Sequence, residues 1–163
     1  MYALTVWQPW AWAIGAGIKT VENRSWLPNW RLLKDGTDIA IHAGVHTPTR
    51  DDYAAMKGIA QQLGHEVPSL SGHELGAEYG RGRVVAVATF AGVAHSRDEL
   101  PSDQKPWWVG KYGWRLANVR QLNLGTAPKV LGQQGLWSLP GGVEQLVRQQ
   151  LSTAAGELWR KTA

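Results

Sequence analysis

Five side chains able to do chemistry stand within six consecutive residues, soon after Gly17, and Trp residues flank them on both sides. They are Lys19, Thr20, Glu22, Asn23 and Arg24. Charged groups are rarely buried without partners, and indole rings form apolar or stacking surfaces. The pattern predicts a pocket for a ligand that is flat, polar and anionic. Gln8 and Trp10, just before the group, are further candidates for ligand contact.

Lys19 is the first candidate within this group. Lysine is a compact cation that binds phosphate, and a desolvated lysine acts as a nucleophile or a base. The alternative is an ordinary lysine at the start of a strand, because the charged end of a lysine side chain usually stays in water. The neighbouring Thr20 and Glu22 favour the functional interpretation.

A strand is predicted over residues 20–25, and side chains alternate between the faces of a strand. Glu22 and Arg24 share one face, and Lys19 and Asn23 fall on the other. An ion pair between Glu22 and Arg24 is expected, either as a structural link or as part of a site. In a site, Glu22 accepts from a base amino group or acts as a general base. Asn23 reads a base edge or completes a turn.

His42 ends an apolar strand and is either a ligand contact or a hydrogen-bonded core histidine. His42 and His46 are four residues apart, which suits a metal site on a helix. At a strand end followed by Gly44 the geometry is poor, and no third ligand is evident. We therefore expect neither a metal nor another cofactor.

Residues 107–114 form a second cluster of aromatic and basic side chains, and Pro106 with two glycines indicates a loop. Trp108, Tyr112 and Trp114 are candidates for stacking on unpaired bases. The alternative is a lid of indole rings over the hydrophobic core.

Regular elements must position these groups. Strands are predicted over residues 3–7, 20–25, 38–43, 82–93, 114–122, 129–131 and 135–139. Helices are predicted from Trp10 to a stop at Gly17, from Thr49 to a stop at Gly64, and over about 141–161. Thr49 and Asp52 resemble a capping box, and residues 65–80 are expected to form a loop.

The strand over 82–93 is apolar on both faces, so we expect it to be central or part of a closed barrel. Short strands, three helices and no βαβ alternation predict an α+β fold, a small mixed β-barrel with peripheral helices. No repeat or linker divides the chain, so residues 1–163 are expected to form a single domain.

Composition narrows the class of protein. The chain has 163 residues, of which 44% are hydrophobic and 18% charged, which is typical of soluble globular proteins. It has no Cys, which excludes disulfides and fits the expected cytoplasmic location. No signal peptide and no apolar run of about 20 residues is visible, so no membrane association is expected. The net charge of +4 permits a polyanionic partner.

The segment from Gln8 to Trp26 resembles the signature of the ASCH domain family (activating signal cointegrator homology), which belongs to the PUA-like superfamily. Residues 39–44, 82–90, 112–116 and 134–137 resemble later segments of the same family. The resemblance covers most of residues 2–139 and leaves out the last helix. It implies a small β-barrel, a cleft lined by residues 17–24, and association with RNA or modified nucleosides.

The resemblance also implies that some members are enzymes. One bacterial group removes the acetyl group of acetylated cytidine with the motif lysine, a threonine three residues later and a distant glutamate. Lys19 matches that lysine, whereas Glu22 stands at the position of the threonine and Thr20 is out of register. Ribonuclease activity also occurs in the family, for which Lys19 and Glu22 would supply a cation and a base.

Three functions are therefore open from the sequence. The first is a module that binds RNA, other single-stranded nucleic acid or a nucleoside, and recognises a single base that is flipped or modified. The second is a hydrolase of RNA or of a modified nucleoside, with Lys19 and Glu22 as catalytic residues. The third is a protein-interaction domain that docks through its Trp clusters.

Overall fold

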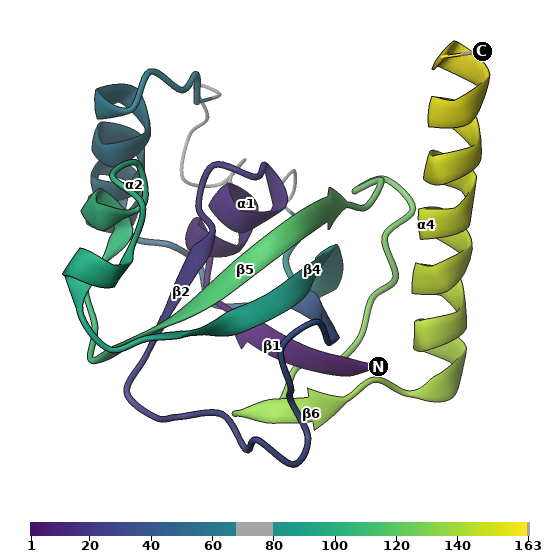
Figure 1. Ribbon diagram of the computed structural model, residues 1–163. Helices are drawn as coiled ribbons and strands as arrows, with labels where there is room; N and C mark the ends of the chain where they lie inside the picture. The colour runs from purple at the N-terminus through teal and green to yellow at the C-terminus, as the bar shows by residue number, and fades with distance from the viewer. Residues whose placement is uncertain (68–79, 163) are drawn as a thin grey trace.

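The computed structural model describes residues 1–67 and 80–162, and it describes side chains up to Thr153. A mixed sheet curls into a half-open barrel and helices pack on it, so the protein has the predicted α+β architecture of a small mixed β-barrel (Figure 1). The elements in chain order are β1 (Tyr2–Val6), α1 (Trp10–Gly15), β2 (Val21–Arg24), β3 (Asp38–Ala43), α2 (Arg50–Gln62), β4 (Arg83–Ala94), the 3-10 turns η1 (Arg97–Glu99) and η2 (Lys105–Trp107), β5 (Tyr112–Gln121), β6 (Leu136–Ser138) and α4 (Gly141–Thr162).

The six strands lie in the order β2-β5-β4-β3-β1-β6. β1 and β3 are parallel, and the other neighbouring pairs are antiparallel. β2 and β6 form the two edges, so within the described residues the barrel is not closed by a pairing between them. The strand predicted over residues 129–131 is wrong. Lys129 makes only an isolated bridge to Arg83, because Pro128 and Gly132 bracket a segment too short for a ladder.

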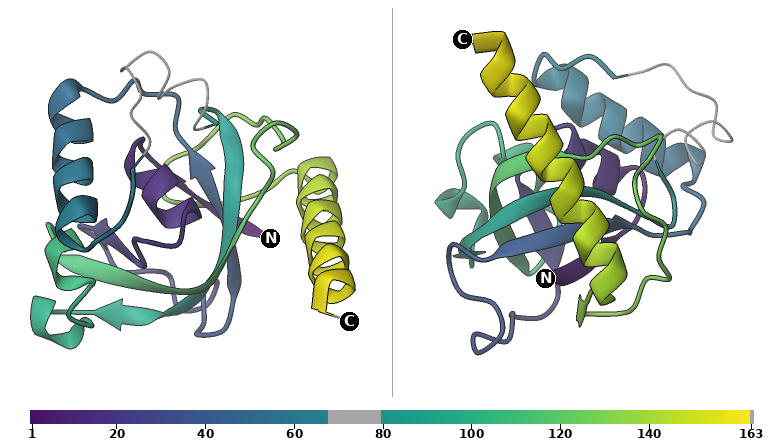
Figure 2. Two further views of the ribbon diagram at one scale, coloured as in Figure 1. Left: turned by 90° about the horizontal axis from the view of Figure 1, so that it is seen from above. Right: turned by 90° about the vertical axis from the view of Figure 1, so that its right-hand side faces the viewer.

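β4 lies inside the sheet, and helices cover it on both sides (Figure 2). Ile14 of α1 packs with Phe90 on the inner face of the curl. Val147 of α4 packs with Val84 and Val87 on the outer face. This double coverage is why the sequence of β4 is apolar on both faces. α1 packs against the inner face of the curled sheet (Figure 2).

α2 begins at the capping box that the sequence predicted. The Thr49 hydroxyl accepts from the Asp52 backbone N–H at 3.0 Å, and the Asp52 carboxylate accepts from the Thr49 N–H at 2.9 Å. Such a cap stabilises a helix by about 1 kcal/mol. Met56 on its buried face packs in one cluster with Trp107, so α2 supports the segment around η2.

Of the loop predicted over 65–80, residues 68–79 lie outside the described residues. No helix in the described part of the chain combines the length and the apolar composition that crossing a membrane requires.

Candidate functional site

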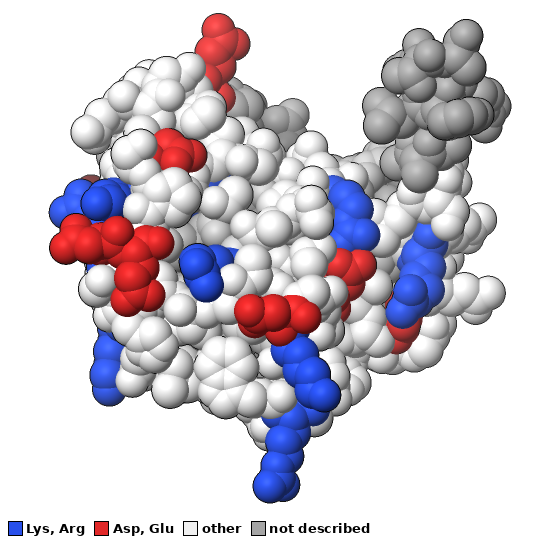
Figure 3. Space-filling view, viewed as in Figure 1, with Lys and Arg blue, Asp and Glu red and all other residues white. Residues whose placement is uncertain are grey.

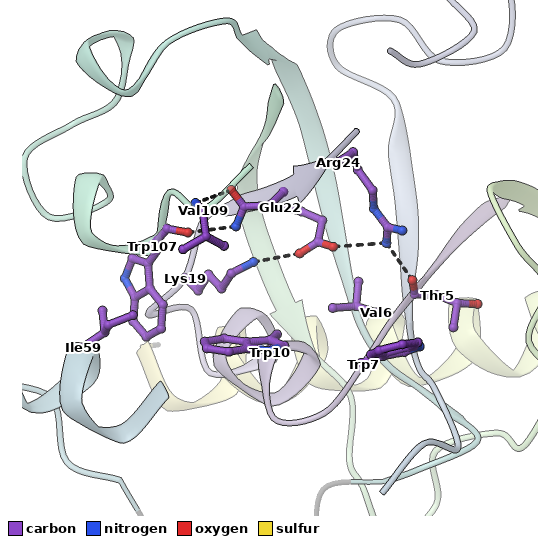
Figure 4. A pocket seen from close by; sticks show the side chains of 11 residues that line it. Thr5, Val6, Trp7, Trp10, Lys19, Glu22, Arg24, Ile59, Trp107 and Val109 are labelled. Atoms are coloured by element: carbon purple, nitrogen blue, oxygen red, sulfur yellow. Dashed lines mark hydrogen bonds and ion pairs between the residues drawn. The ribbon is translucent and has the colours of Figure 1, made fainter. Parts of the chain in front are cut away.

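A cavity of about 240 Å³, which we call the main cavity, opens between β1, α1, the start of β2 and residues 107–109 (Figure 4). It contains five of the candidate ligand contacts predicted from the sequence: Trp10, Lys19, Glu22, Asn23 and Arg24. Its other lining residues are Thr5, Val6, Trp7, Ile59, Trp107 and Val109. Four of the five polar residues of that group therefore line one cavity, together with the indoles of Trp7 and Trp10.

The turn after α1 places Lys19. Gly17 has φ +75°, a left-handed conformation that glycine adopts easily, and its N–H bonds to the Ile14 carbonyl at 2.8 Å. The Lys19 N–H bonds to the Ala13 carbonyl at 3.1 Å. The helix therefore ends abruptly, and the chain turns so that Lys19 enters the cavity before β2 begins.

Gln104, which lies 84 residues after Thr20 in the sequence, clamps the same turn. Its buried side chain accepts from the Thr20 N–H at 2.7 Å and donates to the Ile18 carbonyl at 3.3 Å. Both backbone groups flank Lys19, so this amide fixes the direction from which Lys19 reaches the cavity. Thr20 itself does not line the cavity.

Lys19, Glu22 and Arg24 form a line of ion pairs that we call the charged row. Lys19 Nζ lies 2.7 Å from Glu22 Oε2, and Arg24 Nη2 lies 3.1 Å from Glu22 Oε1. Arg24 Nη2 also donates to the Thr5 carbonyl at 2.6 Å. Lys19 is 2% exposed and Glu22 is 7% exposed, so this pair is almost withdrawn from solvent, whereas Arg24 is partly exposed. Burial strengthens the attraction within the row and makes each member depend on its partners.

The alternation expected for a strand predicts one of the two ion pairs in this row and misses the other. The predicted pairing of Glu22 with Arg24 on one face is confirmed. The prediction that Lys19 points to the opposite face is wrong, because β2 starts only at Val21. Lys19 lies in the preceding turn, where the alternation of a strand does not apply.

Indole rings bound the cavity along the charged row. Trp10 and Trp7 lie on the same side of the row, beneath Lys19 and Arg24 in Figure 4. Trp7 is 61% exposed and stacks on His46 at 4.6 Å between ring centroids. Trp10 meets Trp107 edge to face at 6.5 Å. The cavity thus offers indole surface and fixed charges to the same ligand.

Asn23 lines the cavity and also holds a neighbouring segment in place. Its Nδ2 donates to the Trp107 carbonyl at 2.8 Å, and its Oδ1 accepts from the Val109 N–H at 3.1 Å. Both ends of the amide are therefore used to hold residues 107–109 against β2. Of the two interpretations of Asn23, this geometry favours the structural one.

Comparison with known proteins places the chain in a family. The model of the ASCH domain matches residues 4–123. The chain belongs to the ASCH domain family. The matched range includes every residue that lines the main cavity of this ASCH domain and excludes α4.

Solved structures similar to this ASCH domain include the ASCH protein of Zymomonas mobilis, at 16% sequence identity. The similarity covers 91% of this chain and 93% of that one, with a TM-score of 0.49. A tyrosine-to-phenylalanine mutant of that protein is 15% identical over 91% of this chain and 96% of that one, again with a TM-score of 0.49. No curated protein matches the chain.

Two candidates from the sequence are buried structural residues of this ASCH domain. Gln8 is 1% exposed, and its Oε1 accepts from the Trp12 N–H in the first turn of α1. His42 is also 1% exposed; Nε2 lies 3.0 Å from the Val130 carbonyl and Nδ1 lies 3.3 Å from the Thr5 hydroxyl. Burial lowers the pKa of His42, so the ring is held neutral. It is the hydrogen-bonded core histidine of the two interpretations.

The second aromatic cluster of this ASCH domain packs mainly against the core. Trp114 is fully buried against Phe90 and Trp26, because β5 starts at Tyr112 and turns Trp114 to the inner face. Trp108 packs on the cluster beneath α2, and Tyr112 faces His95 at 5.6 Å. None of the three candidates Trp108, Tyr112 and Trp114 lines the main cavity.

Sequence reasoning missed the residues that reach the cavity from distant segments. Trp107 belongs to the second cluster and was not chosen, although an adjacent pair of Trp gave a signal at that position. Thr5, Ile59 and Val109 line the cavity and carry no local signal of a site, and neither does Gln104, which holds the turn. Their roles depend on contacts across the fold.

Proposed function

We propose that this ASCH domain is a nucleic-acid-binding module that takes one unstacked base of single-stranded RNA, or a nucleoside, into the main cavity. The observation that carries the proposal is the buried charged row beside the rings of Trp7 and Trp10. Indole rings stack on any base, and cations contact phosphate. Each carboxylate oxygen of Glu22 can also accept from an exocyclic amino group.

The size of the cavity supports one small flat group. About 240 Å³ lies just below the range of roughly 300–1,000 Å³ for pockets that hold drug-sized ligands. A base enters such a space only after it leaves its stack, which costs least in a single strand. We therefore expect single-stranded RNA to bind more tightly than duplex of the same sequence, measured at one salt concentration. Equal affinities would contradict the proposed entry of a base.

On the face shown in Figure 3, Lys and Arg are interspersed with Asp and Glu, so this face carries no broad basic patch. We propose that Lys19 and Arg24, the two cations of the row, make the contacts with phosphate. Each neutralised phosphate of a single strand adds about −0.7 to the slope of log K against log salt, so we expect a slope between about −0.7 and −1.4. A slope near zero is expected if the Trp clusters instead dock a protein.

The state of Glu22 favours binding over hydrolysis. Oε2 already accepts from Lys19 and Oε1 from Arg24, so no carboxylate oxygen is free of a cation. A general base must take up a proton, which a cation at each oxygen opposes, whereas the second lone pair of each oxygen can still accept a hydrogen bond from a base amino group. Incubation with RNA and with acetylated cytidine, followed by mass spectrometry, distinguishes the two functions. Unchanged substrates support the binding module, and product formation supports the hydrolase.

Substitution of Lys19 tests the site itself. Lys19→Met removes a charged hydrogen bond to the ligand and keeps the apolar stem, so affinity for an RNA octamer should fall by about 1.5–3 kcal/mol, roughly tenfold or more. Lys34→Met is the matched control, because Lys34 is exposed and lies outside the cavity. Both titrations are run well below the melting temperature of each variant. Equal binding by the two variants would place the ligand elsewhere.

A further inference from the structure

A second cavity, of about 380 Å³, adjoins the main cavity across Arg24 and Trp7. Thr5, Trp7 and Arg24 line both cavities, and Trp26, Gln133, Gln134 and Gly135 complete the second one. We propose that the two cavities are consecutive subsites for one strand, so that the ligand is at least two nucleotides joined by a phosphodiester. This inference rests on the proposed function of the main cavity.

The second cavity has its own groups for a base. Trp26 is half-buried, and its edge-to-face contact with Trp114 at 4.7 Å anchors it to the core. An indole held in this way stacks on a base without a large loss of side-chain entropy. Gln133 and Gln134 are exposed, and neither side chain makes a hydrogen bond within the described part of the chain. Each amide offers a donor and an acceptor to a base edge.

Arg24 stands at the boundary between the subsites. Its Nη2 is engaged by Glu22 in the main cavity and by the Thr5 carbonyl. Nη1 makes no hydrogen bond within the described residues, and the side chain is 18% exposed. The guanidinium also lies over Trp26, with its central carbon 5.9 Å from the ring centroid. A planar cation in this position is suited to the phosphate that links two bases.

The net charge of the charged row matches that of a phosphodiester within a strand better than that of a terminal phosphate. Lys19 and Arg24 contribute +2 and Glu22 contributes −1, which leaves +1. A phosphodiester carries one negative charge, whereas a terminal phosphate monoester carries about −1.5 to −2 at neutral pH. The charged row therefore balances the linkage within a strand without excess charge on either side.

Calorimetric titration of the full chain tests the two subsites. The probes are two dinucleoside monophosphates, adenylyl-adenosine and uridylyl-uridine, and the matching nucleoside 5′-monophosphates at one salt concentration. One additional stacked base should tighten binding roughly 5- to 100-fold, although the dinucleoside carries less charge. Gln134→Ala and Trp26→Leu should bring the affinity for the dinucleoside toward that of the monophosphate. Gln134→Ala should not change the affinity for the monophosphate more than about twofold, because Gln134 does not line the main cavity.

Gln149→Ala is the matched control, because Gln149 is an exposed glutamine on α4, outside both cavities. Gln134 is on the surface, so its variant folds even if Trp26→Leu does not. Equal affinities for the two kinds of probe overturn the second subsite and leave the proposed function standing. The second subsite is also overturned if Gln134→Ala and Trp26→Leu bind the dinucleosides with the affinity of the wild type. Absence of binding by every probe overturns the proposed function, and the second subsite with it.

Discussion

The charged row predicts that loss of its carboxylate costs more stability than loss of its lysine. Glu22 is the one ion-pair partner that Lys19 has among the described residues, and it also pairs with Arg24. Glu22→Gln leaves two cations beside a neutral amide, and the NH₂ group of that amide must face one of them. Lys19→Met instead leaves the pair of Glu22 with Arg24 in place.

The expected magnitudes follow from burial. A buried charge that loses its partner costs about 3–5 kcal/mol, which we expect for Glu22→Gln. Lys19→Met loses one hydrogen bond between charged groups, worth about 1.5–3 kcal/mol. A domain of this size loses about 2–4 °C in melting temperature per kcal/mol, so Glu22→Gln should melt at least about 6 °C below the wild type.

Urea unfolding followed by circular dichroism measures both variants and the double variant. The double variant should cost less than the sum of the single ones, because the two substitutions remove the same ion pair. Equal destabilisation by the two single variants would refute the asymmetry. Additivity within about 0.3–0.5 kcal/mol would show that the pair is not energetically coupled.

Three further predictions concern groups around the row. Burial lowers the pKa of His42 below its usual 6.5, so the unfolded chain binds a proton at a higher pH than the folded protein does. The neutral ring therefore contributes its full stability above pH 6.5, and this contribution is lost as the pH falls towards the folded-state pKa. The urea midpoint of the wild type should drop through that window, and that of His42→Gln should depend less on pH. Thr49→Ala should lower the free energy of unfolding by about 1 kcal/mol and leave RNA affinity unchanged, since neither Thr49 nor Asp52 lines the cavity. Gln104→Ala should cost about 1–3 kcal/mol and weaken RNA binding too, because it frees the turn that holds Lys19; unchanged affinity would show that the turn needs no clamp.

Local patterns in the sequence predict the structure correctly where all the relevant contacts lie within one helix or strand. Alternation along β2 placed Glu22 and Arg24 together, and the spacing of Thr49 and Asp52 identified the cap of α2. The apolar run of β4 indicated a strand covered on both sides. In each case the relevant contacts lie within one element or follow directly from its period.

Contacts between residues far apart in the chain could not be predicted from the sequence. Gln104 and Thr20 are 84 residues apart, and nothing in either segment marks their pairing. Trp114 was assigned to a binding loop because the start of β5 two residues earlier was not visible. Lys19 was given the wrong direction because the hydrogen bond to Ala13 extends the turn before β2. The positions of these side chains depend on where a strand begins and on partners far along the chain, and a single sequence shows neither.

The position of β2 at an edge of the sheet has a consequence for self-association. An unpaired strand edge is a template for strands of other chains, and short edges with inward-pointing charges counteract this. β2 is four residues long and carries both Glu22 and Arg24. Apolar replacement of these two residues would therefore remove a barrier to edge-to-edge aggregation. Insoluble expression of such a variant would reflect this exposed edge, and it would say nothing about the affinity for a ligand.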